Sequence, residues 1–228
     1  IAGWTLSYIV KSASGVFVDA SAAKVVAELE AFKSNTAQMS LVHTLFMGLT
    51  IFVVARGVER GLEQAVKFMV PALLLMMLVL LGYSITSGSF GAGVEFLFTP
   101  DFSKLNWGSV LEAMGQAFFT LSIGMGAIMA YGAYLPEETS IMGASATAIL
   151  AGLVIFPLVF SNGLQPDAGP GLVFQTLPLA LGQMPGGAFF STIFFILLSF
   201  AAWTSAIGLI EPGVAWLVEH FNKTRKEA

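Results

Sequence analysis

The stretch that decides the fold reads Phe118-Phe119-Thr120-Leu121-Ser122-Ile123-Gly124-Met125-Gly126-Ala127. It lies within the uncharged segment 113–136, which is long enough to cross a hydrocarbon core of about 30 Å as a helix. Two glycines near the middle weaken that helix by about 1 kcal/mol each relative to alanine, and in hydrocarbon the freed backbone groups must bind protein, water or a ligand. The stretch therefore predicts a broken membrane helix that offers carbonyls to a cation and N–H groups to an anion. Close packing of these small residues against a neighbouring helix is the alternative.

The charge content excludes an ordinary soluble domain. Of the 228 residues, 11% are charged and 56% are hydrophobic, whereas soluble domains carry about 25% charged residues. The mean hydropathy of +0.83 supports an all-α membrane protein, a multi-span helical bundle. The net charge of −4 gives no basic surface for nucleic acid. Without cysteine, the chain has neither disulfides nor thiolate metal sites.

Further uncharged runs predict the remaining spans, because each is long enough for a membrane helix. Prolines and glycines between Gln165 and Gly187 favour an irregular hairpin or a pair of short helices at a surface. The expected spans lie at roughly 39–55, 66–84, 109–135, 144–162 and 188–218, with a sixth apolar segment at 1–18.

The two ends of the chain indicate a fragment. The first apolar segment opens at Ile1 with no Met and no leader pattern, and the chain stops soon after the last expected span. We therefore expect the central part of a longer transporter-like protein. A complete six-span protein with a short first helix is the alternative.

Basic residues near the span ends predict the orientation. One cluster flanks the connection between two expected spans, and another follows the last span. Because the helices alternate in direction, both clusters are expected on the cytoplasmic side: Arg56, Arg60 and Lys67, and Lys223, Arg225 and Lys226.

A second polar cluster lies in the last expected span. Thr204 and Ser205 are adjacent, and the Ala201 carbonyl precedes them by one helical turn on the same face. Hard cations prefer oxygen donors, so this cluster is a candidate half-site for a small cation. The alternative is that both hydroxyls bond back to carbonyls of their own helix.

Gly61 and Pro71 bracket the start of the 66–84 span. Glycine lowers helix stability and proline removes a backbone donor, so this segment is a candidate for unwinding at the cytoplasmic end. A fixed helix start followed by a static kink is the alternative.

Glu211 lies well inside the last apolar run, directly before Pro212. A carboxylate within a membrane span is a functional candidate, and it requires a partner. We expect that partner on helices absent from this chain.

Several strings along the chain resemble, in order, the neurotransmitter:sodium symporter family, most closely its bacterial amino-acid transporters. The strings are Trp4-Thr5-Leu6, the Gly61 to Pro71 spacing, Gln116 to Gly126, and Phe200 to Pro212. The resemblance implies a fold of twelve helices, in which the first ten form two inverted five-helix repeats and helices one and six are broken. It also implies that 1–228 is a single, incomplete transporter domain covering roughly helices 3 to 8, without helices 1–2 and 9–12.

The resemblance assigns roles position by position. Gln116 matches a position near the chloride site of chloride-dependent members. The resemblance implies substrate-facing positions at Phe119, Ser122 and Met125 in helix six and at Ser205 and Leu209 in helix eight. It implies sodium ligands at Thr120, Ala201 (by its carbonyl), Thr204 and Ser205. It implies gating and unwinding positions at Gly61, Pro71, Gly124, Gly126, Tyr131 and Tyr134.

The chain also departs from the family pattern. Between Tyr134 and Ala151 it is about nine residues shorter, on a span-length argument. The family's helix-seven sodium ligand, usually an Asn, falls in or near this stretch, where the chain has no Asn. Either residues are missing or this site is damaged, and chloride dependence stays open. Met125 stands where a bulky aromatic residue is common, which favours a larger or more varied apolar substrate side chain.

The resulting expectation is sodium-coupled symport of an apolar amino acid across the cell membrane by alternating access. The expected partners are the amino acid, co-transported sodium, the lipid bilayer and the missing helices of the same transporter. A transport-incompetent fragment acting only through helix association is the alternative. An enzyme is disfavoured, because all three aspartates lie in expected loops and neither His43 nor His220 forms a motif with Ser205.

Overall fold

The structure is a computed structural model. It describes residues 1–56, 61–86, 89–120, 141–164, 166, 171–221, 224, 225 and 227. Phe119 and Thr120 are described only as the end of a helix. Six predicted site residues lie outside the described residues: Ser122, Gly124, Met125, Gly126, Tyr131 and Tyr134. The predicted break in helix six lies outside them as well.

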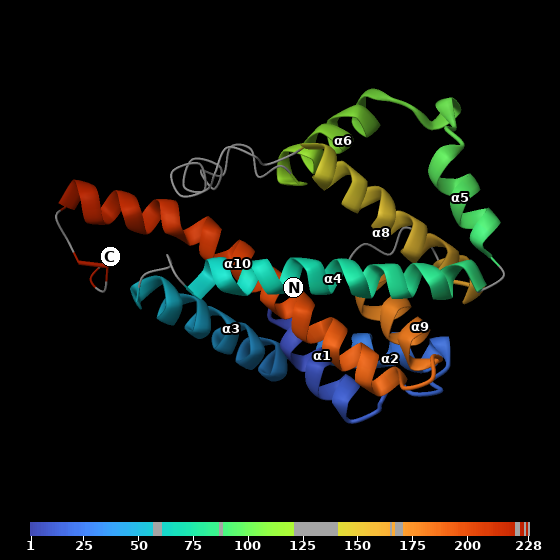
Figure 1. The fold of residues 1–228 in the computed structure, drawn as a ribbon, viewed down its shortest axis with the longest axis horizontal. Helices are drawn as coiled ribbons and strands as arrows, with labels where there is room; N and C mark the ends of the chain where they lie inside the picture. Colours follow the sequence, from blue (N-terminus) through green and yellow to red (C-terminus); the bar gives the residue numbers. More distant parts are fainter. Residues whose placement is uncertain are drawn as a thin grey trace.

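Every regular element in these ranges is a helix (Figure 1). The bounds are α1 Trp4–Ala13, α2 Ala22–Ser34, α3 Thr36–Arg56, α4 Gly61–Thr86, α5 Phe90–Phe98, η1 Phe102–Lys104, α6 Trp107–Thr120, α8 Ile141–Ser161, η2 Leu172–Thr176, α9 Leu177–Gly182 and α10 Gly187–Phe221. The expected spans at 39–55, 66–84, 144–162 and 188–218 are confirmed as helices, each with its ends moved by a few residues.

Two of the described helices have the length and composition to cross a membrane. These are Thr36–Arg56 and Gly187–Phe221. The pair Pro71–Thr86 and Phe90–Phe98, bent by 111°, makes a third if it counts as one span. At 1.5 Å per residue α10 is about 52 Å long, so it extends beyond a core of about 30 Å. Figure 1 shows it running most of the length of the molecule.

Helix α2 was not expected, because its charged residues place it outside the uncharged runs. Ser21 caps its N-terminus by accepting a hydrogen bond from the Lys24 backbone N–H at 3.3 Å. Its apolar side chains at Val25, Leu29 and Phe32 recur at helical spacing and are buried. The charged residues lie on the other faces, so α2 is an amphipathic helix that packs on the core.

The aromatic core gathers around Tyr8 of α1, which is fully buried. Its ring centroid lies 4.9 Å from that of Phe174, 5.1 Å from that of Phe195 and 5.4 Å from that of Phe17. Rings at these separations attract one another beyond the burial of their area. Because these residues come from α1, η2, α10 and the chain after α1, the cluster joins segments far apart in the sequence.

The Pro- and Gly-rich segment contains one short helical run, Leu172–Gly182, in which the π-helical turn η2 continues directly into α9, and not the expected pair of short helices. Every residue of α9 is buried against neighbouring segments, and its position at a membrane surface stays a prediction. At Gly182 an added Cβ would collide with the carbonyl oxygen of Phe17. The Gly182 carbonyl in turn accepts a hydrogen bond from the Asp19 N–H at 3.2 Å. Close backbone contact of this kind needs glycine, and it holds α9 against the chain that follows α1.

Candidate functional site

The site is built on α10, which α1 holds in place through buried hydroxyl pairs. Ser199 donates to the Thr5 hydroxyl at 2.6 Å, and the Ser12 and Ser191 hydroxyls share a hydrogen bond of 2.8 Å. Small hydroxyl residues let two membrane helices approach closely and bond across their interface. Sequence reasoning missed these pairs, because nothing local to a single serine indicates its partner.

Three oxygen atoms of the predicted sodium half-site lie together on α10. The hydroxyls of Thr204 and Ser205 both donate to the Ala201 carbonyl oxygen, at 2.8 and 3.0 Å. The hydroxyls thus bond back to their own helix, as the alternative interpretation predicted. A hydroxyl that donates its proton keeps two acceptor lone pairs, and oxygen lone pairs are what a hard cation binds. The oxygen cluster is therefore compatible with both interpretations, and its role with sodium stays a prediction.

The same face of α10 carries the two predicted substrate positions of helix eight. Ala201, Ser205 and Leu209 are four residues apart, so they lie in one row along the helix. Ala201 is half-buried, whereas Ser205 is exposed and Leu209 is 47% exposed. The described part of the chain does not cover this row completely, so a ligand or a further helix can reach it.

Helix α6 carries the predicted helix-six positions up to Thr120. Its side chains from 111 to 118, including Gln116, are exposed. The described residues therefore leave this face of α6, including Gln116, uncovered. Whether Gln116 and Phe119 act together with Ser205 stays a prediction.

The predicted unwinding segment is wound in this structure. Helix α4 begins at Gly61 and continues through Pro71 without a break. Unwinding of the segment stays a prediction.

Glu211 finds its partner within the chain, so the expected partner on absent helices was wrong. Arg225 Nη1 donates to Glu211 Oε2 at 3.1 Å, and Nη2 donates to Oε1. The Glu211 side chain is 7% exposed and that of Arg225 is 30% exposed. Arg225 also donates to the Val54 carbonyl at 3.4 Å. That contact places Arg225 beside the end of α3, near Arg56 in the last turn of that helix. The cytoplasmic orientation of this end stays a prediction.

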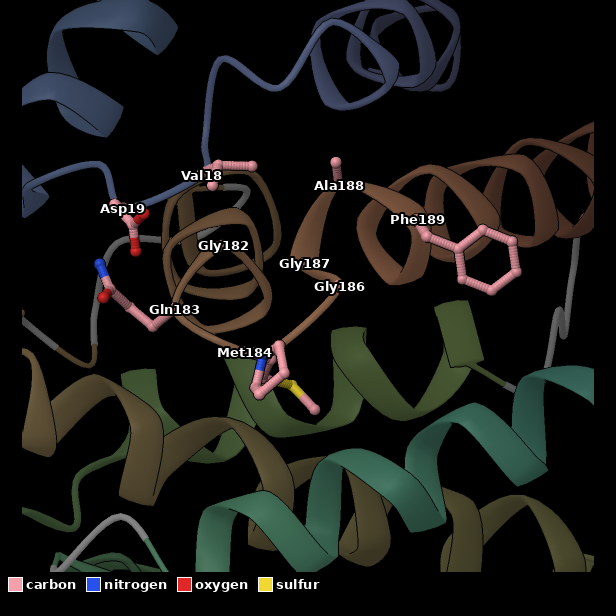
Figure 2. A pocket seen from close by; sticks show the side chains of 10 residues that line it. Val18, Asp19, Gly182, Gln183, Met184, Gly186, Gly187, Ala188 and Phe189 are labelled. Atoms are coloured by element: carbon pink, nitrogen blue, oxygen red, sulfur yellow. The ribbon is translucent and has the colours of Figure 1, made fainter.

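A cavity of about 620 Å³ lies at the other end of α10. Figure 2 shows the side chains of Asp19 and Gln183 on one side of it and the ring of Phe189 on the other. The predicted substrate and sodium residues are not among its lining residues. The cavity is therefore separate from the oxygen cluster.

Residues 4–228 match the profile of the Sodium:neurotransmitter symporter family. The chain belongs to this family. It is 40% identical to the uncharacterized sodium-dependent transporter YhdH of Bacillus subtilis, over 100% of this chain and 52% of that protein. An uncharacterized sodium-dependent transporter of Haemophilus influenzae is 32% identical, again over 100% of this chain and 52% of the relative.

A crystal structure of MhsT in complex with L-phenylalanine has the same fold. The TM-score is 0.90 at 40% identity, over 99% of this chain and 53% of MhsT. This symporter chain thus spans about half the length of the relatives it matches. The predicted class, an all-α bundle of the inverted-repeat transporter type, is confirmed. The family is one of transporters and not of enzymes. The apolar helices of this chain agree with a membrane protein.

Proposed function

We propose that this chain is the central part of a symporter that couples sodium entry to uptake of an apolar amino acid across the cell membrane. The observation that carries the proposal is the oxygen cluster of Ala201, Thr204 and Ser205 on an accessible face of α10. Membership of a sodium-dependent transporter family supports the cation. The single transporter domain, with helices 1–2 and 9–12 supplied by the rest of the protein, is part of the proposal.

Sodium binding at this cluster would require little rearrangement. The two hydroxyl protons that point at the Ala201 oxygen would rotate away, and hydroxyl rotors turn to suit their surroundings. The three oxygens then face the ion, and the missing helices complete its shell. Neutral ligands suit an ion that must both bind and leave during transport.

The apolar substrate class rests on two observations. Leu209 presents an apolar side chain on the row that also carries Ser205. The 40% identical MhsT is solved with L-phenylalanine, an amino acid with a large apolar side chain. Phe119, Ser122 and Met125 from helix six would form the other side of the pocket. Alternating access would follow from movement of these elements relative to α10, with Gly61 and Pro71 allowing release toward the cytoplasm.

The test is Thr204→Val in the complete transporter, which removes one oxygen at nearly constant shape. A contact to a charged group contributes about 1.5–3 kcal/mol, so the half-saturating sodium concentration should rise about tenfold or more. The measurement is sodium-dependent binding of a radiolabelled apolar amino acid.

Thr192→Val is the matched control. Thr192 lies on the same helix and donates to the Ala188 carbonyl at 2.6 Å, but it lies outside the predicted site. Its sodium dependence should stay at the wild-type value. Equal sodium dependence in both variants and the wild type would show that Thr204 is a packing residue.

A further inference from the structure

The outer face of α3 carries an apolar row that ends in a cation. Leu41, Leu45, Leu49 and Phe52 are 46–60% exposed, and Arg56 is exposed in the last turn. At about 100° per residue these positions fall within a sector of about 80°. The buried residues of α3 follow a different row, made of Val42, Phe46, Thr50 and Val54.

Arg56 is held against this row. Its guanidinium carbon lies 4.0 Å from the centroid of the Phe52 ring, which is a cation–π contact. Long helical side chains point back toward the N-terminus, so the guanidinium lies over the preceding turn. Within the described part of the chain no carboxylate lies within ion-pair distance of Arg56.

We propose that Arg56 and this row bind one anionic phospholipid of the cytoplasmic leaflet. The phosphate would lie on the guanidinium fork, whose planar donors match phosphate oxygens. An acyl chain would lie along Phe52, Leu49, Leu45 and Leu41. The eleven residue-to-residue steps from Leu41 to Phe52 span about 16 Å, which matches one leaflet of a core of about 30 Å.

The neighbouring charges select Arg56 as the headgroup ligand. Arg225 lies at the same end of α3, where it contacts the Val54 carbonyl. Its charge is already compensated by Glu211. A second apolar helix on the row would leave the Arg56 charge uncompensated in hydrocarbon, whereas a phosphate neutralises it. The cytoplasmic leaflet also carries the anionic lipids that attract such cations.

The experiment uses the complete transporter, purified and delipidated in mild detergent. Native mass spectrometry follows the binding of dioleoyl-phosphatidylglycerol to the wild type, to Arg56→Gln and to Phe52→Leu. We expect about a fivefold loss of affinity in Arg56→Gln, as for one basic residue near an anionic surface. Phe52→Leu should also bind more weakly, because it keeps the apolar row but removes the ring that positions Arg56. Melting temperatures of all variants should match the wild type.

Lys33→Gln is the matched control. Lys33 lies beyond the opposite end of α3 and pairs with Glu30 at 2.8 Å, so its loss should leave lipid binding unchanged. Equal phosphatidylglycerol affinity in Arg56→Gln and the wild type would overturn the proposal. A dimer that crosslinks through a cysteine placed at Leu45, and that binds no lipid there, would overturn it as well.

Discussion

Arg225 donates hydrogen bonds to both carboxylate oxygens of Glu211, a residue buried within α10. The two residues are 14 positions apart in the sequence. The same guanidinium reaches the last turn of α3 at Val54. One side chain thus neutralises a buried charge within α10 and links it to the last turn of α3.

Removing one member of this pair should destabilise the protein. Arg225→Gln leaves the Glu211 carboxylate buried without its partner, and breaking a buried pair costs about 3–5 kcal/mol. Because Arg225 is 30% exposed, we expect the lower end of this range. The double variant Glu211→Gln/Arg225→Gln should be more stable than Arg225→Gln alone. The measurement is denaturant unfolding of the complete protein in detergent, with Lys33→Gln as an exposed-pair control that changes stability by less than about 1 kcal/mol. Equal stability of the single and double variants would contradict the role of the pair.

The hydrogen bond between the Ser12 and Ser191 hydroxyls, which joins α1 to α10, should contribute a measurable coupling free energy to stability. Ser12→Ala and Ser191→Ala each leave a buried hydroxyl unpaired, whereas the double variant removes both groups. In membrane proteins such couplings average about 0.6 kcal/mol and reach about 1.7. A double-mutant cycle on unfolding free energies measures the value. Ser14→Ala, at an exposed serine that bonds within its own helix, is the control and should be nearly neutral. Strict additivity of the two α1–α10 substitutions would show that the pair contributes nothing.

Two glycines should respond oppositely to alanine. Gly182→Ala forces a methyl group into the Phe17 carbonyl, so the backbone must shift, and overpacking of this kind costs about 1–3 kcal/mol. Gly48 in α3 has open space around its added Cβ, so Gly48→Ala should gain up to about 1 kcal/mol of helix stability. Thermal unfolding of the two variants compares them directly. A stabilising effect at Gly182 would mean that α9 packs differently against the chain after α1.

Gly61→Ala tests the predicted unwinding at the start of α4. Alanine stiffens the helix, so turnover should fall more than substrate affinity does. Uptake rates in proteoliposomes and equilibrium binding of the amino acid give the two quantities for the complete transporter. Gly48→Ala is the helix-glycine control, and its turnover should equal that of the wild type. Unchanged turnover with weakened binding at Gly61→Ala would contradict a release role.

Local spacing along one helix was sufficient for the part of the site on α10. Ala201, Thr204 and Ser205 are separated by one helical turn, so any helix through them brings their oxygens together. The apolar runs likewise predicted α3, α4, α8 and α10, because a membrane helix satisfies all its backbone groups within one segment. Helix α5 was not predicted. Helix α2 could not be predicted from the uncharged runs, because it contains charged residues and its buried row consists of only three side chains.

The sequence by itself determined the class of protein, the main helices and the oxygen cluster on α10, since each follows from composition or from contacts within one turn. Only the tertiary structure decided that Arg225 pairs with Glu211, that Ser12 meets Ser191 and that α9 is buried. These contacts join residues distant along the chain, and their geometry depends on how the helices pack. The physical reason is that helix formation is governed by local hydrogen bonds, whereas the choice among many compatible partners is made by packing.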